Sequence, residues 1–292
     1  MSNHQAGILA PTPKLSRYMT FKLEPEMDPL EGLKALQEII DAESSVVGIG
    51  QSLLNALGKT IPGMRNFPVL TGPGIEIPST PASLWCWLRG DDRGEVLHRS
   101  RRIEQALAID FKLEDVVDSF MYADSRDLSG YIDGTENPQG DEAIEAAICH
   151  HQGAGIDGSS FVAVQQWRHD LDHFAEMSEA EQDDVIGRHQ GNNEEFDAAP
   201  ESAHVKRAAQ ESFTPEAFML RRSMPWAEGM DSGLMFVAFG HSFDAYEAIL
   251  KRMIGSEDGL SDALFSFTQP ISGAYFWCPP GKDGRLDLQA LL

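Results

Sequence analysis

The sequence predicts an α+β protein made of two βαββαβ units, and two observations support this prediction. In the first half of the chain, short apolar or β-branched runs alternate with helical patterns in the order β-α-β, β-α-β. The second half repeats this rhythm, although no residue-level repeat relates the halves. Because each helix must bury its apolar stripe, we expect two ferredoxin-like antiparallel sheets with helices packed on them.

In the first half, the clearest local signals surround a helix that begins near Asp28 and Pro29. Asp28 can cap this helix and Pro29 suits its first turn, while leucines recur on one face from Leu30 to Leu36. The other predicted elements are strands over 18–23, 45–49, 84–88 and 116–122 and a helix over 94–108.

In the second half, Ser178 and Glu181 form a capping-box pattern that opens a helix towards Ile186. Ser242 can cap a later helix that carries an apolar stripe. The predicted strands of this half cover 161–164, 234–239 and 275–277. We therefore expect an N-terminal half over 1–140, a C-terminal half over 160–292, and a Gly- and Ala-rich connection over 141–159.

The composition limits the classes of partner. With 46 Asp and Glu against 23 Lys and Arg, the formal charge of −23 disfavours nucleic acid and anionic membranes. Cys86, Cys149 and Cys278 are widely spaced, which indicates thiols of a reducing compartment rather than a disulfide framework. No basic leader or membrane-length apolar run is visible, so we expect a cytoplasmic protein.

One carboxylate, Asp133, lies close to two glycines, Gly130 and Gly134. Glycine allows backbone angles and close approaches that a side chain would forbid, so this segment can run tightly against a flat ligand and aim Asp133 at it. An ordinary surface turn has the same composition, and turn statistics alone favour that interpretation. The rest of the chain must decide between the two.

Five ordered motifs decide in favour of the ligand. They are Gly130-Tyr131-Ile132-Asp133-Gly134-Thr135-Glu136-Asn137-Pro138, Trp167-Arg168-His169-Asp170-Leu171, Val185-Ile186-Gly187-Arg188, Ser202-Ala203-His204-Val205 and Leu220-Arg221-Arg222-Ser223-Met224-Pro225. In order and spacing the chain resembles the haem-dependent dye-decolourising peroxidases of the bacterial type B, over nearly its whole length. The resemblance implies facing antiparallel sheets of the dimeric α+β barrel type, with the cofactor held mainly by the C-terminal half.

By resemblance, His204 is the proximal ligand of the iron of haem b (iron protoporphyrin IX). Asp262 lies where the family tends to place a carboxylate partner for that histidine, which would stabilise oxidised iron. A capping role at a helix end is the alternative for Asp262.

On the distal face, the resemblance places Asp133 and Arg221. Asp133 would move a proton between the peroxide oxygens, and Arg221 would stabilise the negative charge that develops. Because successive strand residues face opposite ways, Ser223 should face the same way as Arg221 and hydrogen-bond peroxide or water, while Arg222 points away.

At the haem edge, Arg188 is expected to bind a propionate, since a guanidinium binds a carboxylate with two hydrogen bonds. Family members often continue this motif with Thr-Lys, whereas this chain has His189 and Gln190, which leaves one propionate contact open. Glu136 and Asn137 are expected to touch the haem edge through backbone groups. The tryptophans and tyrosines could act as surface radical sites, but core packing is the favoured interpretation for most of them.

The resemblance implies an oxidoreductase: a peroxidase that reduces hydrogen peroxide and oxidises small organic donors, such as dyes and phenolics, in one-electron steps through a ferryl intermediate. We expect an acidic optimum and a homo-oligomer, a dimer or larger. The alternatives are a haem-handling protein for storage, delivery or iron removal with incidental peroxidase activity, and a cofactor-free sensor. The C-terminal stretch from Arg285 to Leu292 could dock into a shell protein or a neighbouring subunit, although plain packing is favoured.

Overall fold

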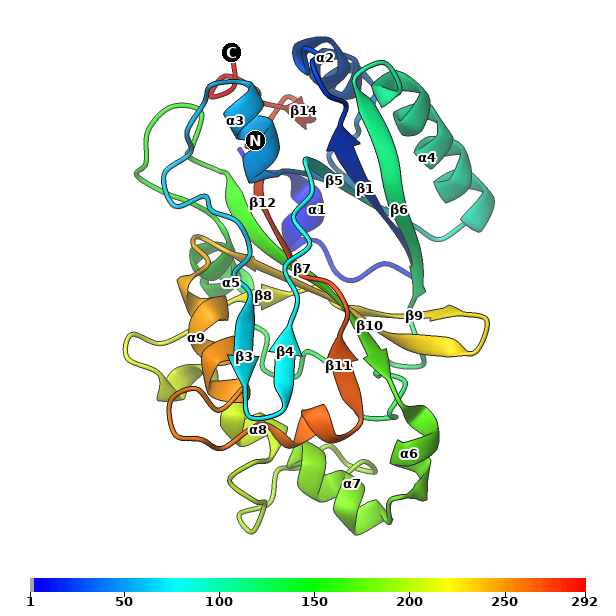
Figure 1. The fold of residues 1–292 in the computed structure, drawn as a ribbon, viewed down its shortest axis with the longest axis vertical. Coiled ribbons are helices and arrows are strands. Elements are labelled where there is room, and N and C mark those ends of the chain that lie inside the picture. Colours follow the sequence, from blue (N-terminus) through cyan, green and yellow to red (C-terminus); the bar gives the residue numbers. More distant parts are fainter. Residues whose placement is uncertain (1–2) are drawn as a thin grey trace.

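A computed structural model describes residues 3–292, and its main feature is a ten-stranded antiparallel sheet (Figure 1). The strands are β1 (Leu15–Leu23), β2 (Ser45–Ile49), β5 (Leu84–Gly90), β6 (Phe111–Phe120), β7 (Ser160–His169), β8 (Leu220–Arg221), β9 (Met224–Glu228), β10 (Asp231–Gly240), β11 (Thr268–Pro270) and β12 (Ala274–Cys278). Their order is β11-β7-β12-β2-β5-β1-β6-β9-β10-β8, and β7 also pairs with β10. This additional pairing closes the sheet into a barrel.

The barrel consists of two four-stranded sheets with the strand orders β2-β5-β1-β6 and β12-β7-β10-β9. Each has the order of a ferredoxin-like unit, in which the first and third strands are central. The two sheets meet at single residue pairs, Ile49 with Trp277 and Ser119 with Trp226. The predicted α+β class with two ferredoxin-like units is therefore confirmed.

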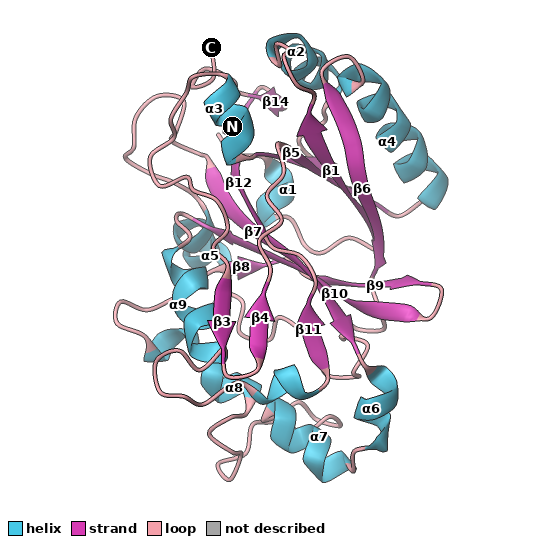
Figure 2. Cartoon of the chain, viewed as in Figure 1, coloured by secondary structure: helices cyan, strands magenta, loops and turns pink. Residues whose placement is uncertain are grey.

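Helices flank both sheets (Figure 2). They are α1 (Ala6–Leu9), α2 (Leu30–Ile39), α3 (Gln51–Ala56), α4 (Arg93–Leu107), α5 (Gly140–Ala147), α6 (Leu171–Glu176), α7 (Glu179–Ile186), α8 (His204–Arg207) and α9 (Asp244–Met253), with 3₁₀ turns η1 (Gln210–Ser212) and η2 (Ala263–Ser266). Helices α2 and α4 lie against the first sheet, and α9 lies against β10 of the second. Small hairpins form from β3 (Leu70–Gly72) with β4 (Ile75–Ile77) and from β13 (Gly281–Lys282) with β14 (Arg285–Leu286).

Strand alternation divides the apolar side chains between two cores. Tyr18, Trp85 and Trp87 belong to the cluster inside the barrel, and the ring centroid of Tyr18 lies 6.1 Å from that of Trp85 and 6.0 Å from that of Trp87. The intervening Met19 and Cys86 pack on the opposite face with the leucines of α2 and α4. Trp85 stacks on Phe276 and Trp87 on Phe239 of the second sheet, with ring centroids 5.9 and 6.1 Å apart, so aromatic packing between the sheets holds the two halves together.

The observed elements differ from the predicted ones mainly where charged or amide side chains interrupt an apolar run. Strand β6 begins at Phe111 rather than 116, because its first residues alternate charged with apolar side chains. Strand β7 continues through Gln165 and Gln166 to His169. The predicted connection over 141–159 contains most of α5, which packs on α1 and β10.

Three leucines of the C-terminal stretch pack against the rest of the protein. Leu286, Leu288 and Leu291 are buried, as plain packing of the C-terminal stretch predicts. Cys86, Cys149 and Cys278 are buried free thiols. Among the helices of residues 3–292, none has the length and apolar character that crossing a bilayer would require.

Candidate active site

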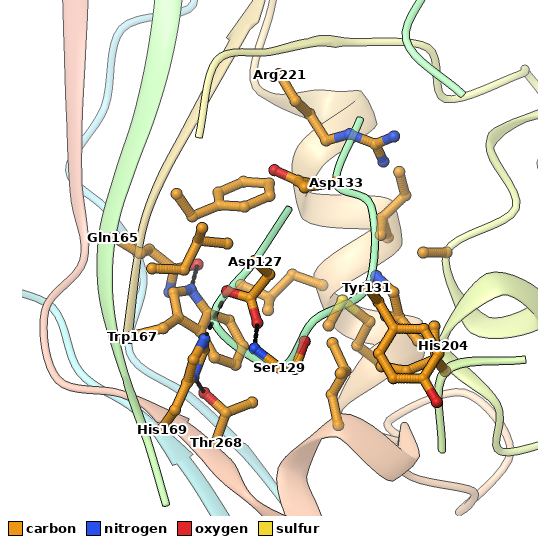
Figure 3. Close-up of a pocket in the computed structure, with 18 of the residues that line it drawn as sticks. Asp127, Ser129, Tyr131, Asp133, Gln165, Trp167, His169, His204, Arg221 and Thr268 are labelled. Atoms are coloured by element: carbon orange, nitrogen blue, oxygen red, sulfur yellow. Dashed lines mark hydrogen bonds and ion pairs between the residues drawn. The ribbon is translucent and has the colours of Figure 1, made fainter. Parts of the chain in front are cut away.

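A deep pocket lies beside β7 and β10, between the loop over 121–139, α8 and α9 (Figure 3). Its cavity volume is about 150 Å³. Much of the wall is apolar and comprises Met219, Leu234, Phe236, Ile249, Leu250, Met253, Leu264 and Phe267. Polar groups gather at a few points on this wall, among them Asp133, His204 and Arg221.

The mouth of this pocket is polar. A second cavity shares Asp133, His204 and Arg221 with the deep pocket, so the two spaces adjoin each other. Its other polar lining residues are Thr135, Glu136, Arg188, Glu195, Lys206, Gln210 and Glu211. The combined space therefore suits a ligand with an apolar body and a charged edge.

His204 is the first residue of α8 and is hydrogen-bonded to a buried carboxylate. Its Nδ1 lies 2.8 Å from Oδ2 of Asp262, whose side chain is fully buried. The other oxygen of Asp262, Oδ1, accepts a hydrogen bond from the backbone N–H of Leu264 at the start of η2. Asp262 thus makes both of the contacts considered for it, and within residues 3–292 Nε2 of His204 has no hydrogen-bond partner.

Asp133 lies in a tight loop whose backbone requires glycine. Gly130 and Gly134 have φ values of +90° and +76°, a region that residues with a Cβ rarely adopt. The backbone N–H of Asp133 donates to the carbonyl of Ser125, which fixes the loop. Burial raises the pKa of Asp133 above its ordinary value of 3.8, and the positive charge of Arg221 partly opposes this increase.

Arg221 ends β8 and lies beside Asp133 in Figure 3. The side chain of Asn137 fixes its backbone, since Oδ1 accepts from the N–H of Arg221 at 2.8 Å and Nδ2 donates to its carbonyl at 3.1 Å. Within residues 3–292, Nε of Arg221 is buried without a hydrogen-bond partner, and no ion pair within 4.0 Å joins Arg221 to Asp133. The guanidinium is therefore available to an anionic ligand.

The side chains of Ser223 and Arg222 point in different directions after β8. Ser223 lines a small polar pocket together with Asp133, Asn137 and Arg221, so it faces the same group of residues as Arg221. Arg222 turns towards the N-terminal segment, where its Nη2 donates to the carbonyl of Leu9.

Arg188 lies at the mouth and is held by acidic neighbours. Its Nη2 donates to Oε1 of Glu136 at 2.9 Å and forms a second ion pair with Glu195. A ligand carboxylate would have to share this guanidinium with them. Asn137, in contrast, lines the small polar pocket and not the mouth, so its observed contact is with Arg221.

Sequence reasoning assigned no role to a second buried polar group in the pocket wall. His169 at the end of β7 forms two hydrogen bonds: Nε2 lies 2.9 Å from Oδ1 of Asp127, and Nδ1 lies 2.6 Å from Oγ1 of Thr268. Gln165, also in the wall, keeps a buried amide Nε2 without a partner in the described part of the chain. The Trp-Arg-His-Asp motif contains His169, but only the folded chain brings Asp127 and Thr268 to it.

These features fit the predicted haem: a histidine with one ring nitrogen that meets no partner in the described part of the chain, a largely apolar wall, a mouth that contains an arginine, and an inner guanidinium whose Nε is also unpaired there. They define a haem-type pocket on a two-unit α+β barrel. Residues 124–283 match the family model of the Dyp-type peroxidase, C-terminal.

Comparison with known proteins leads to the same family. The chain is 30% identical over 244 residues to a dye-decolorizing peroxidase of Mycobacterium tuberculosis, a match that covers 81% of this chain and 73% of the relative. The structure of DypB from Rhodococcus jostii RHA1 superimposes with a TM-score of 0.86 at 27% identity, covering 94% of this chain and 95% of that one, and a DypB variant has been solved in complex with heme. The Deferrochelatase of Escherichia coli K12 is 26% identical over 54% of this chain and 44% of its own length. This chain belongs to the dye-decolorizing peroxidase family, as the motifs predicted, and is a peroxidase.

Proposed function

We propose that this protein is a haem b peroxidase that reduces hydrogen peroxide and oxidises small organic donors, such as dyes and phenolics, one electron at a time. One observation carries the proposal: the same cavity is lined by a histidine paired with a buried carboxylate, His204 with Asp262, and by Asp133 and Arg221. Family membership supports the same activity.

The residues that would hold haem are distributed between the apolar wall and the mouth. His204 would ligate the iron through Nε2, because its Nδ1 is engaged by Asp262. Arg188 would bind a propionate at the mouth, beside Glu136. When bound, haem would supply a redox-active iron at which peroxide is cleaved and which accepts electrons from the donors.

Asp133 would act as the proton shuttle. Its carboxylate takes a proton from one peroxide oxygen and returns it to the other as the O–O bond breaks. Arg221, whose Nε has no protein partner within residues 3–292, stabilises the negative charge on the departing oxygen. Ser223 faces the same small polar pocket and would hydrogen-bond peroxide or a water molecule there.

Asp262 would act through His204. A buried carboxylate that accepts from Nδ1 makes the imidazole a stronger electron donor, which favours oxidised iron. This favours peroxide reduction over reversible oxygen binding.

Stopped-flow kinetics tests the proposal. The haem-loaded protein should show a Soret band and consume hydrogen peroxide. His204→Ala should lose the normal Soret spectrum, while Asp133→Ala and Arg221→Ala should keep haem and consume peroxide about 10²-fold or more slowly. If neither distal variant slows peroxide consumption, the catalytic assignment is wrong even though haem binding survives.

The match to Deferrochelatase raises the alternative of a haem-handling protein with incidental peroxidase activity. This alternative requires release of iron or intact haem as the main product. Incubating the haem-loaded protein with peroxide and a phenolic donor, and quantifying free iron, intact porphyrin and oxidised donor, separates the two functions. A peroxidase turns over many donor molecules per haem, whereas a haem-handling protein releases at most one iron per haem. A cytoplasmic location and homo-oligomerisation remain predictions from the sequence.

A further inference from the structure

Tyr131 lines the deep pocket two residues before Asp133, and its hydroxyl points away from Asp133 (Figure 3). Its side chain is only 4% exposed and packs edge-on against Phe174. The hydroxyl donates a hydrogen bond to Oδ1 of Asp183 on α7, with an O–O distance of 2.6 Å. A tyrosine of the candidate haem pocket is therefore hydrogen-bonded directly to a carboxylate.

The hydrogen bonds of Asp183 keep its carboxylate ionised. Besides Tyr131, Asp183 accepts from Nδ1 of His189 at 2.7 Å and from the backbone N–H of Gln190 at 3.1 Å. Burial alone would raise the pKa of Asp183, but these hydrogen bonds hold it below its ordinary value. Asp183 is thus an ionised carboxylate, 7% exposed, at hydrogen-bonding distance from a phenol.

His189 connects this buried pair to the surface. Its side chain is 51% exposed and stacks on Phe196 with ring centroids 4.7 Å apart. His189 and Gln190 occupy the two positions where family members often have Thr and Lys. The side chain of His189 therefore supplies one of the three hydrogen bonds that Asp183 receives, whereas the bond from Gln190 comes from its backbone.

Tyr246 provides an internal comparison, because it also lines the pocket but has a different partner. Its hydroxyl donates to Oε1 of Gln165, a neutral amide oxygen, at 2.5 Å. An amide is a far weaker base than a carboxylate, so Tyr246 has no comparable proton acceptor in this bond.

A buried phenol can lose an electron readily only if its proton leaves at the same time. Burial and the bond to Asp183 raise the pKa of Tyr131 well above 10.0, so the phenol is protonated at neutral pH. An oxidised phenol is in contrast a strong acid, and a carboxylate at hydrogen-bonding distance can take the proton.

We propose that Tyr131 is a redox-active residue of the peroxidase, with Asp183, held by His189, as its proton acceptor. This inference rests on the proposed haem peroxidase function. When peroxide reduction leaves an oxidising equivalent in the pocket, Tyr131 gives up one electron to it. The phenolic O–H bond breaks and the proton bonds to Oδ1 of Asp183, which leaves a neutral tyrosyl radical. An organic donor then supplies one electron, and the proton returns to the phenol oxygen.

Freeze-quench electron paramagnetic resonance tests this proposal. The haem-loaded full-length protein, with ring-deuterated tyrosine, is mixed with hydrogen peroxide in the absence of a donor. We expect an organic radical signal that narrows on deuteration, is lost in Tyr131→Phe and persists in Tyr246→Phe. A signal of unchanged yield in Tyr131→Phe would overturn the proposal.

Asp183→Asn tests the proton acceptor while Tyr131 stays in place. Radical formation in the wild-type protein should be slower in D₂O, because a proton moves with the electron. In Asp183→Asn, we expect a lower radical yield and loss of this isotope effect. If both are unchanged, Asp183 is not the proton acceptor. If Tyr131→Phe does not take up haem, Asp183→Asn still tests the proposal. An unaltered radical yield and isotope effect in Asp183→Asn would then contradict proton transfer from Tyr131 to Asp183.

The same samples distinguish an error in the redox role of Tyr131 from an error in the proposed peroxidase function. Peroxide consumption and the Soret band are recorded alongside each spectrum. A wild-type protein that consumes peroxide without a tyrosyl signal would contradict the redox role of Tyr131 alone. A protein that binds haem but consumes no peroxide would contradict the proposed peroxidase function.

Discussion

Nδ1 of His204 and Oδ2 of Asp262 lie 2.8 Å apart, although the two residues are 58 positions apart in the sequence. The carboxylate is fully buried, while the histidine ring faces the pocket. A hydrogen bond from Nδ1 to a buried carboxylate fixes the tautomer and the orientation of the ring. This pair therefore sets both the position and the basicity of the proposed iron ligand.

The first prediction concerns this pair. Asp262→Asn removes the negative charge but keeps a side-chain oxygen that can still cap η2 through Leu264. We expect the ferric/ferrous potential to rise and peroxidase activity to fall about 10- to 100-fold, because the imidazole becomes a poorer electron donor. Spectroelectrochemistry and steady-state kinetics measure the two effects. Asp262→Glu, which retains the charge, is the control, and an unchanged potential in Asp262→Asn would contradict the role.

The second prediction is the pH dependence of peroxide reduction. Asp133 acts as a base only when ionised, and burial raises its pKa above 3.8. The rate should therefore increase with pH through this raised pKa and fall as pH drops below it. Stopped-flow rates from pH 3 to 7 should show this acidic limb in the wild-type protein and not in Asp133→Asn. A variant that keeps the same limb would show that another group titrates.

The third prediction follows from the charge of Arg221, which lowers the pKa of Asp133 and so opposes the effect of burial. In Arg221→Leu this effect is lost, so the acidic limb should move to higher pH while the maximal rate falls about 10²- to 10³-fold. In Arg221→Lys, which keeps a positive charge, the pH at which the rate falls should stay nearer to that of the wild-type protein. A limb that does not move in Arg221→Leu would mean that the two groups are not electrostatically coupled.

The fourth prediction concerns the barrel interior. Gly48 lies on β2, and a Cβ built there would be 2.6 Å from Cβ of Phe276 on β12. Gly48→Ala should therefore destabilise the protein by about 1–3 kcal/mol, because the two sheets cannot separate locally without loss of packing. Gly191→Ala is the matched control, since a Cβ at Gly191 meets no heavy atom within 4 Å. Urea denaturation measures both, and equal stabilities of the two variants would contradict the packing argument.

Part of the fold could be predicted because its signals are local. The bounds of β2 coincide with the predicted 45–49, and the capping box of Ser178 with Glu181 is formed at the start of α7. Strand β6 was predicted too short, because charged side chains on an exposed strand face hide the apolar alternation. The division into halves at 140 and 160 stays a prediction.

The candidate site, like the fold, could be predicted only in part from the sequence. The five motifs singled out Asp133, His204 and Arg221 as residues of one pocket, and the structure places all three on its wall. Their catalytic roles remain predictions. For Asn137, the observed contact with the backbone of Arg221 could not be predicted, because it joins residues 84 positions apart.

The sequence by itself determined the family, many of the longer elements and the residue types that chemistry requires, because capping patterns, glycine spacing and motif order depend on neighbours along the chain. Only the tertiary structure decided which atoms meet: β7 with β10 to close the barrel, and Tyr131 with Asp183 beside the pocket. Such contacts depend on how sheets and loops pack across long separations in the chain. No local pattern encodes them, and the tyrosine relay becomes visible only in the folded protein.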